Sequence, residues 1–172
     1  MSSKKTIVVY KSSAGFTKAY ADWIAESLEC QVISLKDATI NILSGYDVIV
    51  YGGGIRANMI NGLDKLKKRV CDKIICVFAV GASDANQTLI SEIKKINQTN
   101  LSDLPFYYFR GGLQIDKLHG IEKIMMNMIK KFLSKKVEIS AKEKEMLEML
   151  SNPCDLSNRE AIKPLIVHVN SL

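Results

Sequence analysis

The stretch Ile7-Val8-Val9-Tyr10-Lys11-Ser12-Ser13-Ala14-Gly15-Phe16-Thr17 decides the fold class of this 172-residue chain. Its apolar first half predicts a buried strand over 6–10, and a helical pattern over 17–28 follows the turn. Small and hydroxyl-bearing residues at a helix N-terminus offer backbone N–H groups, hydroxyl donors and the positive end of the helix dipole, which together suit a phosphate. The stretch therefore predicts a mononucleotide site after the first strand of an α/β chain.

Strand and helix patterns alternate along most of the chain. Near-continuous apolar runs between helices are typical of a parallel sheet that is covered on both faces, and right-handed crossovers then give a three-layer sandwich. The expected strands are 6–10, 30–35, 47–52, 73–80 and 105–109, and the expected helices between them are 17–28, 63–70 and 87–96.

The alternation ends at Gly111-Gly112, after which the chain becomes helical. Apolar residues recur at three- and four-residue spacing over 121–132, and Ser140 with Glu143 forms a capping box before a second helix over 141–150. Pro164 must kink or start the helix expected over 157–169. No linker or repeat interrupts the chain, so we expect one domain over 1–172.

Composition bounds the class of protein. The chain is 47% hydrophobic and 24% charged, which is ordinary for a globular domain. No apolar run is long enough to span a bilayer and no signal-peptide core precedes the first strand, so a cytoplasmic location is expected. The net charge of +6 indicates attraction to an anionic ligand, an acidic partner or a membrane surface.

Cysteine and histidine are scattered, without a CxxC pair or a cluster, so no metal site is expected. We expect the cysteines to be reduced and mostly buried. The residues concerned are Cys30, Cys71, Cys76, Cys154, His119 and His168.

Four loops follow strands and should meet at one edge of the sheet: 12–17, 52–59, 81–86 and 110–115. All are rich in Gly, Ala, Ser or Asn, which permit close backbone approach to a flat ligand or a phosphate. The chain has no Gly-x4-Gly-Lys-Ser/Thr loop, no GxGxxG after the first strand and no acidic cluster at the strand ends. P-loop, dinucleotide and phospho-receiver sites are therefore not expected.

These segments resemble the flavodoxin-like proteins, and within them the family that includes bacterial menaquinone-dependent protoporphyrinogen oxidase. Residues 12–17 match the Ser/Thr-x-x-Gly-x-Thr phosphate loop, and 46–56 are similar to the family's third strand with its small-residue turn and Ile-Arg ending. Residues 109–113 resemble the turn before a helical insert. Cys154-Asp155 with 162–166 resembles the closing segment.

The resemblance implies a flavodoxin-like sandwich with a five-stranded parallel sheet in the order 2-1-3-4-5 and a helical insert over about 113–152, before the last helix. It also implies non-covalent FMN, with the phosphate on the first loop and the ring between the second and third. The implied cofactor residues are Ser12, Ser13, Ala14, Gly15, Phe16 and Thr17; Gly53, Gly54, Ile55, Arg56 and Ala57; Gly81, Ala82, Ser83 and Asp84; and Gly111 and Gly112.

Two departures bear on activity. Neither 52–59 nor 81–86 offers the aromatic ring that electron-carrier flavodoxins usually stack on the flavin, which favours substrate turnover. Residues 111–136 hold six lysines against two acids, whereas such carriers are typically acidic. The Met-rich helix could receive an anionic tetrapyrrole or lie against an anionic membrane through 117–136; alternatively, it packs on the core with a solvated lysine face.

The leading hypothesis is an FMN-dependent oxidoreductase that oxidises an anionic organic substrate and passes electrons to a quinone or another acceptor. Arg56 and Arg110 are the candidate ligands for the substrate anion, and His119 is either a proton relay or a surface residue. The alternatives are a flavodoxin-type electron carrier with a redox partner protein and a flavin-free binding module. No nucleic-acid partner is expected, and the location would be cytoplasmic, with peripheral contact at the inner membrane face.

Overall fold

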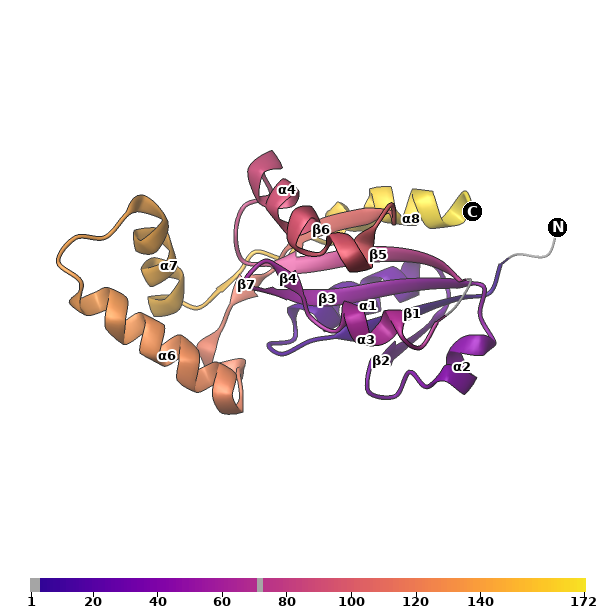
Figure 1. The fold of residues 1–172 in the computed structure, drawn as a ribbon, viewed down its shortest axis with the longest axis horizontal. Coiled ribbons are helices and arrows are strands. Elements are labelled where there is room, and N and C mark those ends of the chain that lie inside the picture. The colour runs from indigo at the N-terminus through magenta and orange to yellow at the C-terminus, as the bar shows by residue number, and fades with distance from the viewer. Residues whose placement is uncertain (1–3, 71–72) are drawn as a thin grey trace.

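Five parallel strands form the centre of the fold, in the order β2-β1-β3-β5-β6 (Figure 1). The computed structural model describes residues 4–70 and 73–172. The strands are β1 (Thr6–Lys11), β2 (Gln31–Ser34), β3 (Val48–Arg56), β5 (Ile74–Gly81) and β6 (Phe106–Arg110). Taken along the chain, this is the predicted order 2-1-3-4-5, so the predicted parallel sheet is confirmed.

Helices cover both faces of the sheet, as predicted for a three-layer sandwich. They are α1 (Phe16–Ser27), α2 (Ile40–Ser44), α3 (Leu63–Lys67), α4 (Gln87–Ile96), α5 (Gln98–Leu101) and α8 (Lys163–Asn170). Successive side chains of a strand point to opposite faces, so β1 supplies Val8 to one core and Ile7 to the other. Val8 packs in the core of Tyr20 and Leu165, from α1 and α8, and Ile7 shares its core with Ile93 of α4.

Short elements add detail that periodicity does not reveal, because two to five residues carry no recognisable period. The strand β4 (Met59–Ile60) folds back on β3, so the sheet has six strands where five were predicted. Pro164 lies in the first turn of α8 and therefore starts this helix. The other unpredicted elements are α2, α5, β7 (Gly112–Leu113), β8 (Cys154–Asp155), η1 (Ile115–Lys117) and η2 (Arg159–Ile162).

The chain leaves the sandwich through β7 and returns through β8, and these two strands pair antiparallel. Between them lie α6 (Gly120–Lys135) and α7 (Ala141–Ser151), which contact each other. We call residues 114–153 the insert. Figure 1 shows α6 and α7 in orange beyond the carboxyl ends of the strands, while the C-terminus lies at the opposite end.

The insert leaves an apolar stripe of α6 exposed. Ile121, Met128 and Phe132 share one side of the helix and are 82%, 67% and 66% exposed, whereas Leu133 on another side is buried. The interpretation that this Met-rich face packs on the core is therefore wrong. Within the described residues, no helix is both long enough and apolar enough to cross a bilayer.

The hydroxyl of Tyr20 ties α1 to both ends of the inserted segment. It donates a hydrogen bond to the carbonyl of Arg110 (2.6 Å) and accepts one from the N–H of Asn158 (2.9 Å). Its ring stacks on Phe109, with 4.9 Å between the centroids. One buried side chain thus fixes where the chain departs from the sheet and where it resumes.

The hairpin between β3 and β4 turns through two residues in the left-handed region. Ala57 and Asn58 have φ of 47° and 59°, and Arg56 pairs directly with Met59. This is the pattern of a tight two-residue hairpin turn, in which asparagine is favoured and alanine is strained. The local sequence does not account for this turn by itself, so the hairpin needs support from elsewhere.

Asn97, which follows α4, provides that support from a buried position. It is 5% exposed, and its amide nitrogen donates to the carbonyls of Asn58 (2.8 Å) and Ile93 (2.7 Å). The N–H of Ile60 donates to its amide oxygen (3.0 Å). Through these three hydrogen bonds, the amide group of Asn97 holds the hairpin against α4.

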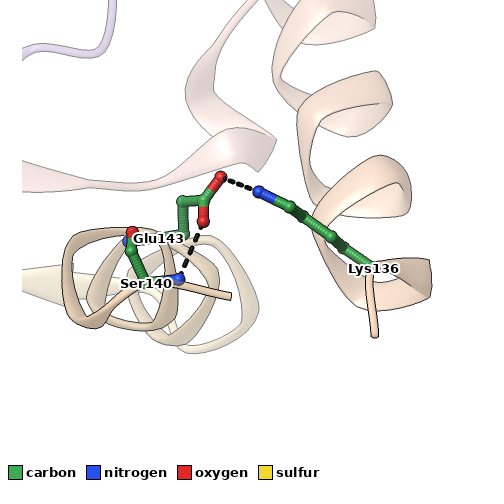
Figure 2. Close-up of polar contacts among 3 residues, drawn as sticks. All are labelled: Lys136, Ser140 and Glu143. Carbon is green, nitrogen blue, oxygen red and sulfur yellow. Dashed lines mark hydrogen bonds and ion pairs between the residues drawn. The ribbon is translucent and has the colours of Figure 1, made fainter. Parts of the chain in front are cut away.

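A reciprocal cap starts α7 (Figure 2). The N–H of Ser140 donates to Glu143 Oε2 (2.8 Å), and the N–H of Glu143 donates to Ser140 Oγ (3.2 Å), so the predicted capping box is confirmed. Lys136 Nζ donates to the other carboxylate oxygen of Glu143 (2.7 Å). The ammonium of Lys136, followed by the N–H of Ser140, lowers the pKa of Glu143 to about 2.

The first prediction concerns Asn97. Replacing it with Asp should lower the free energy of unfolding by ~1–3 kcal/mol, because a carboxylate cannot donate to the buried carbonyls of Asn58 and Ile93. Urea unfolding measures this loss. Gln98→Glu makes the same chemical change at an exposed neighbour and should stay within ~0.5 kcal/mol of wild type. Equal losses in both variants would contradict the role given to Asn97.

The second prediction concerns the pH dependence of the insert. Because the pKa of Glu143 is lowered on folding, its stabilising contribution is complete above about pH 4.5 and is lost as the pH falls toward 2. An NMR titration of Glu143 should give a midpoint near 2 in wild type and a higher one in Lys136→Met. Lys135→Met should leave the midpoint unchanged. A wild-type midpoint near 4.5 would show that the cap is not formed as described.

Candidate functional site

One cavity lies where the loops at the carboxyl ends of the strands meet the insert. Its volume is about 900 Å³, within the usual range for ligand sites. Parallel strands bring these loops to the same edge of the sheet. Most of the cofactor residues expected from the sequence line this cavity: Ser12, Ser13, Ala14, Phe16, Thr17, Gly54, Ile55, Arg56, Ala57, Gly81, Ala82, Ser83, Asp84 and Gly112.

The loop of residues 12–17, which we call the phosphate loop, leads into the N-terminus of α1. Gly15 has a φ of +96°, a left-handed conformation that suits glycine, and its N–H donates to Ser12 Oγ (3.0 Å). Among the described residues, no side chain caps this helix and none in its first turn is acidic. The first-turn N–H groups and the hydroxyl of Thr17 therefore form a donor set that suits a phosphate.

The β3–β4 hairpin forms one wall of the cavity, through Gly54 to Asn58. Gly53 does not line the cavity. A Cβ atom on Gly53 would lie 2.8 Å from the carbonyl oxygen of Asn61, so its lack of a side chain lets the chain of β4 pass close to β3. Its contribution to the site is to shape the hairpin.

The loop of residues 81–84 forms the facing wall and is held from β6. The hydroxyl of Tyr108 donates to the carbonyl of Ser83 (2.8 Å), and Nε of Arg110 donates to that of Ala82 (3.2 Å). Arg110 also pairs with Asp84 (2.5 Å). Burial raises the pKa of Tyr108 to about 12, so it remains a neutral donor. Arg110 thus lies behind this loop and outside the cavity wall, and its role toward a substrate stays a prediction.

Gly111 and Gly112 lie beside the phosphate loop. A Cβ on Gly111 would be 2.7 Å from Val80 Cγ1, and one on Gly112 would be 2.1 Å from the carbonyl oxygen of Cys154. Gly112 lines the cavity and Gly111 does not. Gly112 lets β7 and β8 approach each other where the insert begins, and Gly111 lets the chain pass close to Val80 and Phe16.

The insert closes the cavity with side chains that are not among the expected cofactor residues, although the Met-rich helix that carries some of them was one candidate for receiving the substrate. An amphipathic pattern gives a helix but not the surface that it faces, so no local signal identified them. Asn58, Asn61 and Asn86 come from elements or loops near the expected ones. Leu113 of β7 also lines the cavity, and the insert residues that do so are Leu118, Glu122, Met125, Met126, Lys142, Glu143, Glu145, Met146 and Met149.

Glu122 of α6 makes the polar contact between the insert and the loops. Ser13 Oγ donates to Glu122 Oε1 (3.2 Å), and the guanidinium of Arg56 pairs with the same oxygen. Both partners line the cavity. The side chain of Arg56, expected to hold a substrate anion, is therefore paired within the chain.

Other candidate residues lie outside this cavity. His119 is exposed at the start of α6 and does not line it. Cys76 is buried, Cys30 and Cys154 are half-buried, and Cys71 lies outside the described residues. Burial raises the pKa of Cys30 to about 11 and that of Cys76 to about 12, so both are thiols at neutral pH. Within 4–70 and 73–172, no group of three or more His, Cys, Asp or Glu could hold a metal ion.

The residues at this edge of the sheet fit FMN. The phosphate loop offers backbone and hydroxyl donors, and the first turn of α1, which follows it, carries no acidic residue. Two walls built mainly from small residues, 54–58 and 81–84, face the same cavity and can admit a flat ring. Bound FMN would supply the redox chemistry, and the loops would fix its position and access.

Comparisons with known proteins give the family. The family model described as "Flavodoxin domain" matches residues 7–140. A structure described as that of a flavoprotein from Bacteroides eggerthii has a TM-score of 0.50 at 13% identity, covering 62% of this chain and 87% of that one. A flavodoxin from the domain Archaea has a TM-score of 0.47 at 18% identity, covering 86% and 96%. The two-electron reduced Megasphaera elsdenii flavodoxin has a TM-score of 0.47 at 14% identity, covering 61% of this chain and 84% of that one.

No curated protein sequence matches the chain. The first of these structures is similar in fold, and the family model spans more than half of the sequence. The chain therefore belongs to the flavodoxin domain family, and FMN is the cofactor that this membership supports.

Proposed function

We propose that the chain is an FMN-dependent oxidoreductase, similar to protoporphyrinogen oxidase, which oxidises an anionic organic substrate and passes the electrons to a quinone or another acceptor. The observation that carries the proposal is the shared cavity. It extends from the loops expected to hold FMN to Met125 and Met126 of α6 and Met146 and Met149 of α7. A second, largely apolar molecule can therefore lie between the flavin and the insert.

The net charge of +6 of the whole chain supports an anionic substrate. The cavity lining itself is mixed: Arg56 and Lys142 are its cationic side chains, and Asp84, Glu92, Glu122, Glu143 and Glu145 are acidic. A guanidinium group binds a carboxylate through two parallel hydrogen bonds. The 54–58 and 81–84 walls carry no aromatic side chain to cover the flavin; the aromatic side chains that line the cavity, Phe16 and Tyr108, come from α1 and β6.

The electrons and protons balance without a further reactant. Each two-electron turnover removes two electrons and two protons from the substrate, and a quinone acceptor takes up both and becomes a hydroquinone. Arg56 would bind and orient the substrate, and the methionines of α6 and α7 would exclude water from its apolar part.

Two other functions use the same fold. A flavodoxin-type electron carrier would exchange single electrons with a redox partner, which would be acidic because this chain is basic. A flavin-free binding module would keep the cavity but lose FMN. The methionine-lined cavity favours the oxidoreductase over the carrier, which needs only an accessible flavin edge.

The third prediction tests this function. The purified chain should bind FMN and oxidise protoporphyrinogen with menadione as acceptor. Arg56→Gln should raise KM about tenfold, because it removes a charged hydrogen-bond donor from the substrate. Lys117→Gln makes the same charge change outside the cavity and should leave KM unchanged. Rapid one-electron cycling with a reductase and no substrate oxidation would support the carrier, and absence of FMN binding would support the binding module.

We also propose that α6 contacts an anionic bilayer through residues 117–136, which would give the chain a cytoplasmic location, peripheral at the inner membrane face. The stripe of Ile121, Met128 and Phe132 is exposed, and six lysines in this segment face only one acidic residue, Glu122. An exposed apolar stripe flanked by lysines suits an anionic lipid surface. A quinone dissolved in that bilayer would lie near the insert.

The fourth prediction tests the membrane contact. Phe132→Glu should weaken binding to phosphatidylglycerol-containing vesicles about tenfold or more in co-sedimentation. The change replaces an exposed apolar side chain by a negative charge, which the anionic lipid repels. Ile42→Glu, at an exposed apolar residue of α2, should bind as wild type does. If the wild-type protein does not bind vesicles and instead forms a dimer that Phe132→Glu dissociates, the stripe binds a second copy of the chain and the proposed membrane contact is wrong.

A further inference from the structure

Glu122 brings a negative charge to the phosphate loop. Its Oε1 accepts a hydrogen bond from Ser13 Oγ (3.2 Å) and pairs with the guanidinium of Arg56. Ser13 belongs to the phosphate loop and Arg56 to the hairpin, and all three residues line the cavity. The carboxylate of α6 thus joins two groups that would each favour an anionic ligand.

The chemistry of this contact is competitive. A hydroxyl donor and a guanidinium are typical ligands for a phosphate as well as for a carboxylate. A phosphate on the 12–17 loop would meet Glu122 as a like charge, and like charges repel strongly where water is partly excluded. The Ser13 hydroxyl has one proton to donate, so it cannot hold Glu122 and the phosphate of a ligand at the same time.

The insert is attached in a way that allows Glu122 to give way. Among the hydrogen bonds and ion pairs of the described residues, those of Glu122 alone join α6 to the sandwich. α6 begins at Gly120 with a φ of +56°, and a Cβ built there would have nothing within 4 Å. Just beyond, Ile121 is exposed. Separation of Glu122 from the loops therefore breaks no other hydrogen bond or ion pair between the described residues of α6 and the sandwich.

We propose that Glu122 is a specificity-determining residue of the flavin site: its carboxylate competes with the ligand's phosphate for the hydroxyl of Ser13, and its release leaves Arg56 free for the substrate anion. The inference rests on the proposed FMN binding. The Glu122 carboxylate lowers the preference of the site for phosphorylated over unphosphorylated flavin. It also links the phosphate to the insert, because the phosphate releases the polar contact that holds α6 against the loops.

The fifth prediction compares FMN with riboflavin, which differs from FMN by lacking the phosphate. Glu122→Gln should lower the Kd for FMN about tenfold and leave the Kd for riboflavin unchanged, as measured by quenching of flavin fluorescence. Glu145→Gln is the matched control, since Glu145 also lines the cavity from the insert but has no bond to Ser13 or Arg56. It should leave the ratio of the two constants as in wild type.

Hydrogen exchange supplies a readout that does not depend on flavin. The amides of residues 124–127 donate to the first-turn carbonyls of α6 and are protected while that turn is held. Inorganic phosphate should speed their exchange in wild type, whereas in Glu122→Gln their exchange should be fast without phosphate. Three results would overturn this inference and leave the proposed function standing. They are an unchanged ratio of the Kd values for FMN and riboflavin in Glu122→Gln, an equal change of that ratio in Glu145→Gln, and exchange in α6 that does not respond to phosphate. Absence of FMN binding in wild type and both variants would overturn the proposed function as well.

Discussion

Parallel pairing of β1, β3, β5 and β6 is the constraint on which the rest of the structure depends. Parallel strands need crossover helices, and these helices bury both faces of the sheet, so the central strands β1, β3 and β5 carry nearly continuous apolar runs, whereas the edge strand β2 begins and ends with polar residues. The same pairing brings the carboxyl ends of the strands to one edge. The phosphate loop, the hairpin and the 81–84 loop therefore meet there, although they are far apart in the sequence.

Loops of small residues admit a ligand but cannot define their own shape, so neighbouring elements hold them from behind. Asn97 holds the hairpin, and Tyr108 and Arg110 hold the 81–84 loop. Tyr20 fixes the point where the chain leaves β6 and the point where it returns. Asn97, Arg110 and Tyr20 do this from outside the cavity, whereas Tyr108 also lines it.

The insert turns a cofactor site into a cavity with two halves. The sandwich provides the donors and the narrow walls, while α6 and α7 provide methionines and a carboxylate. The insert also carries the exposed apolar stripe, so cofactor, substrate and surface contacts all involve one pair of helices. The proposed oxidoreductase activity and the proposed competition at Glu122 both depend on this position of the insert.

The sequence by itself determined what local pattern controls: the strands and helices of the sandwich, the phosphate loop before α1 and the capping box at Ser140. The family resemblance supplied the strand order. Tertiary structure decided which faces meet. It exposed the stripe of α6, placed Arg110 behind its loop and brought Glu122 to Ser13 and Arg56. The physical reason is that periodicity and capping act over a few residues, whereas these contacts join side chains up to 109 positions apart and exist only after the chain has packed.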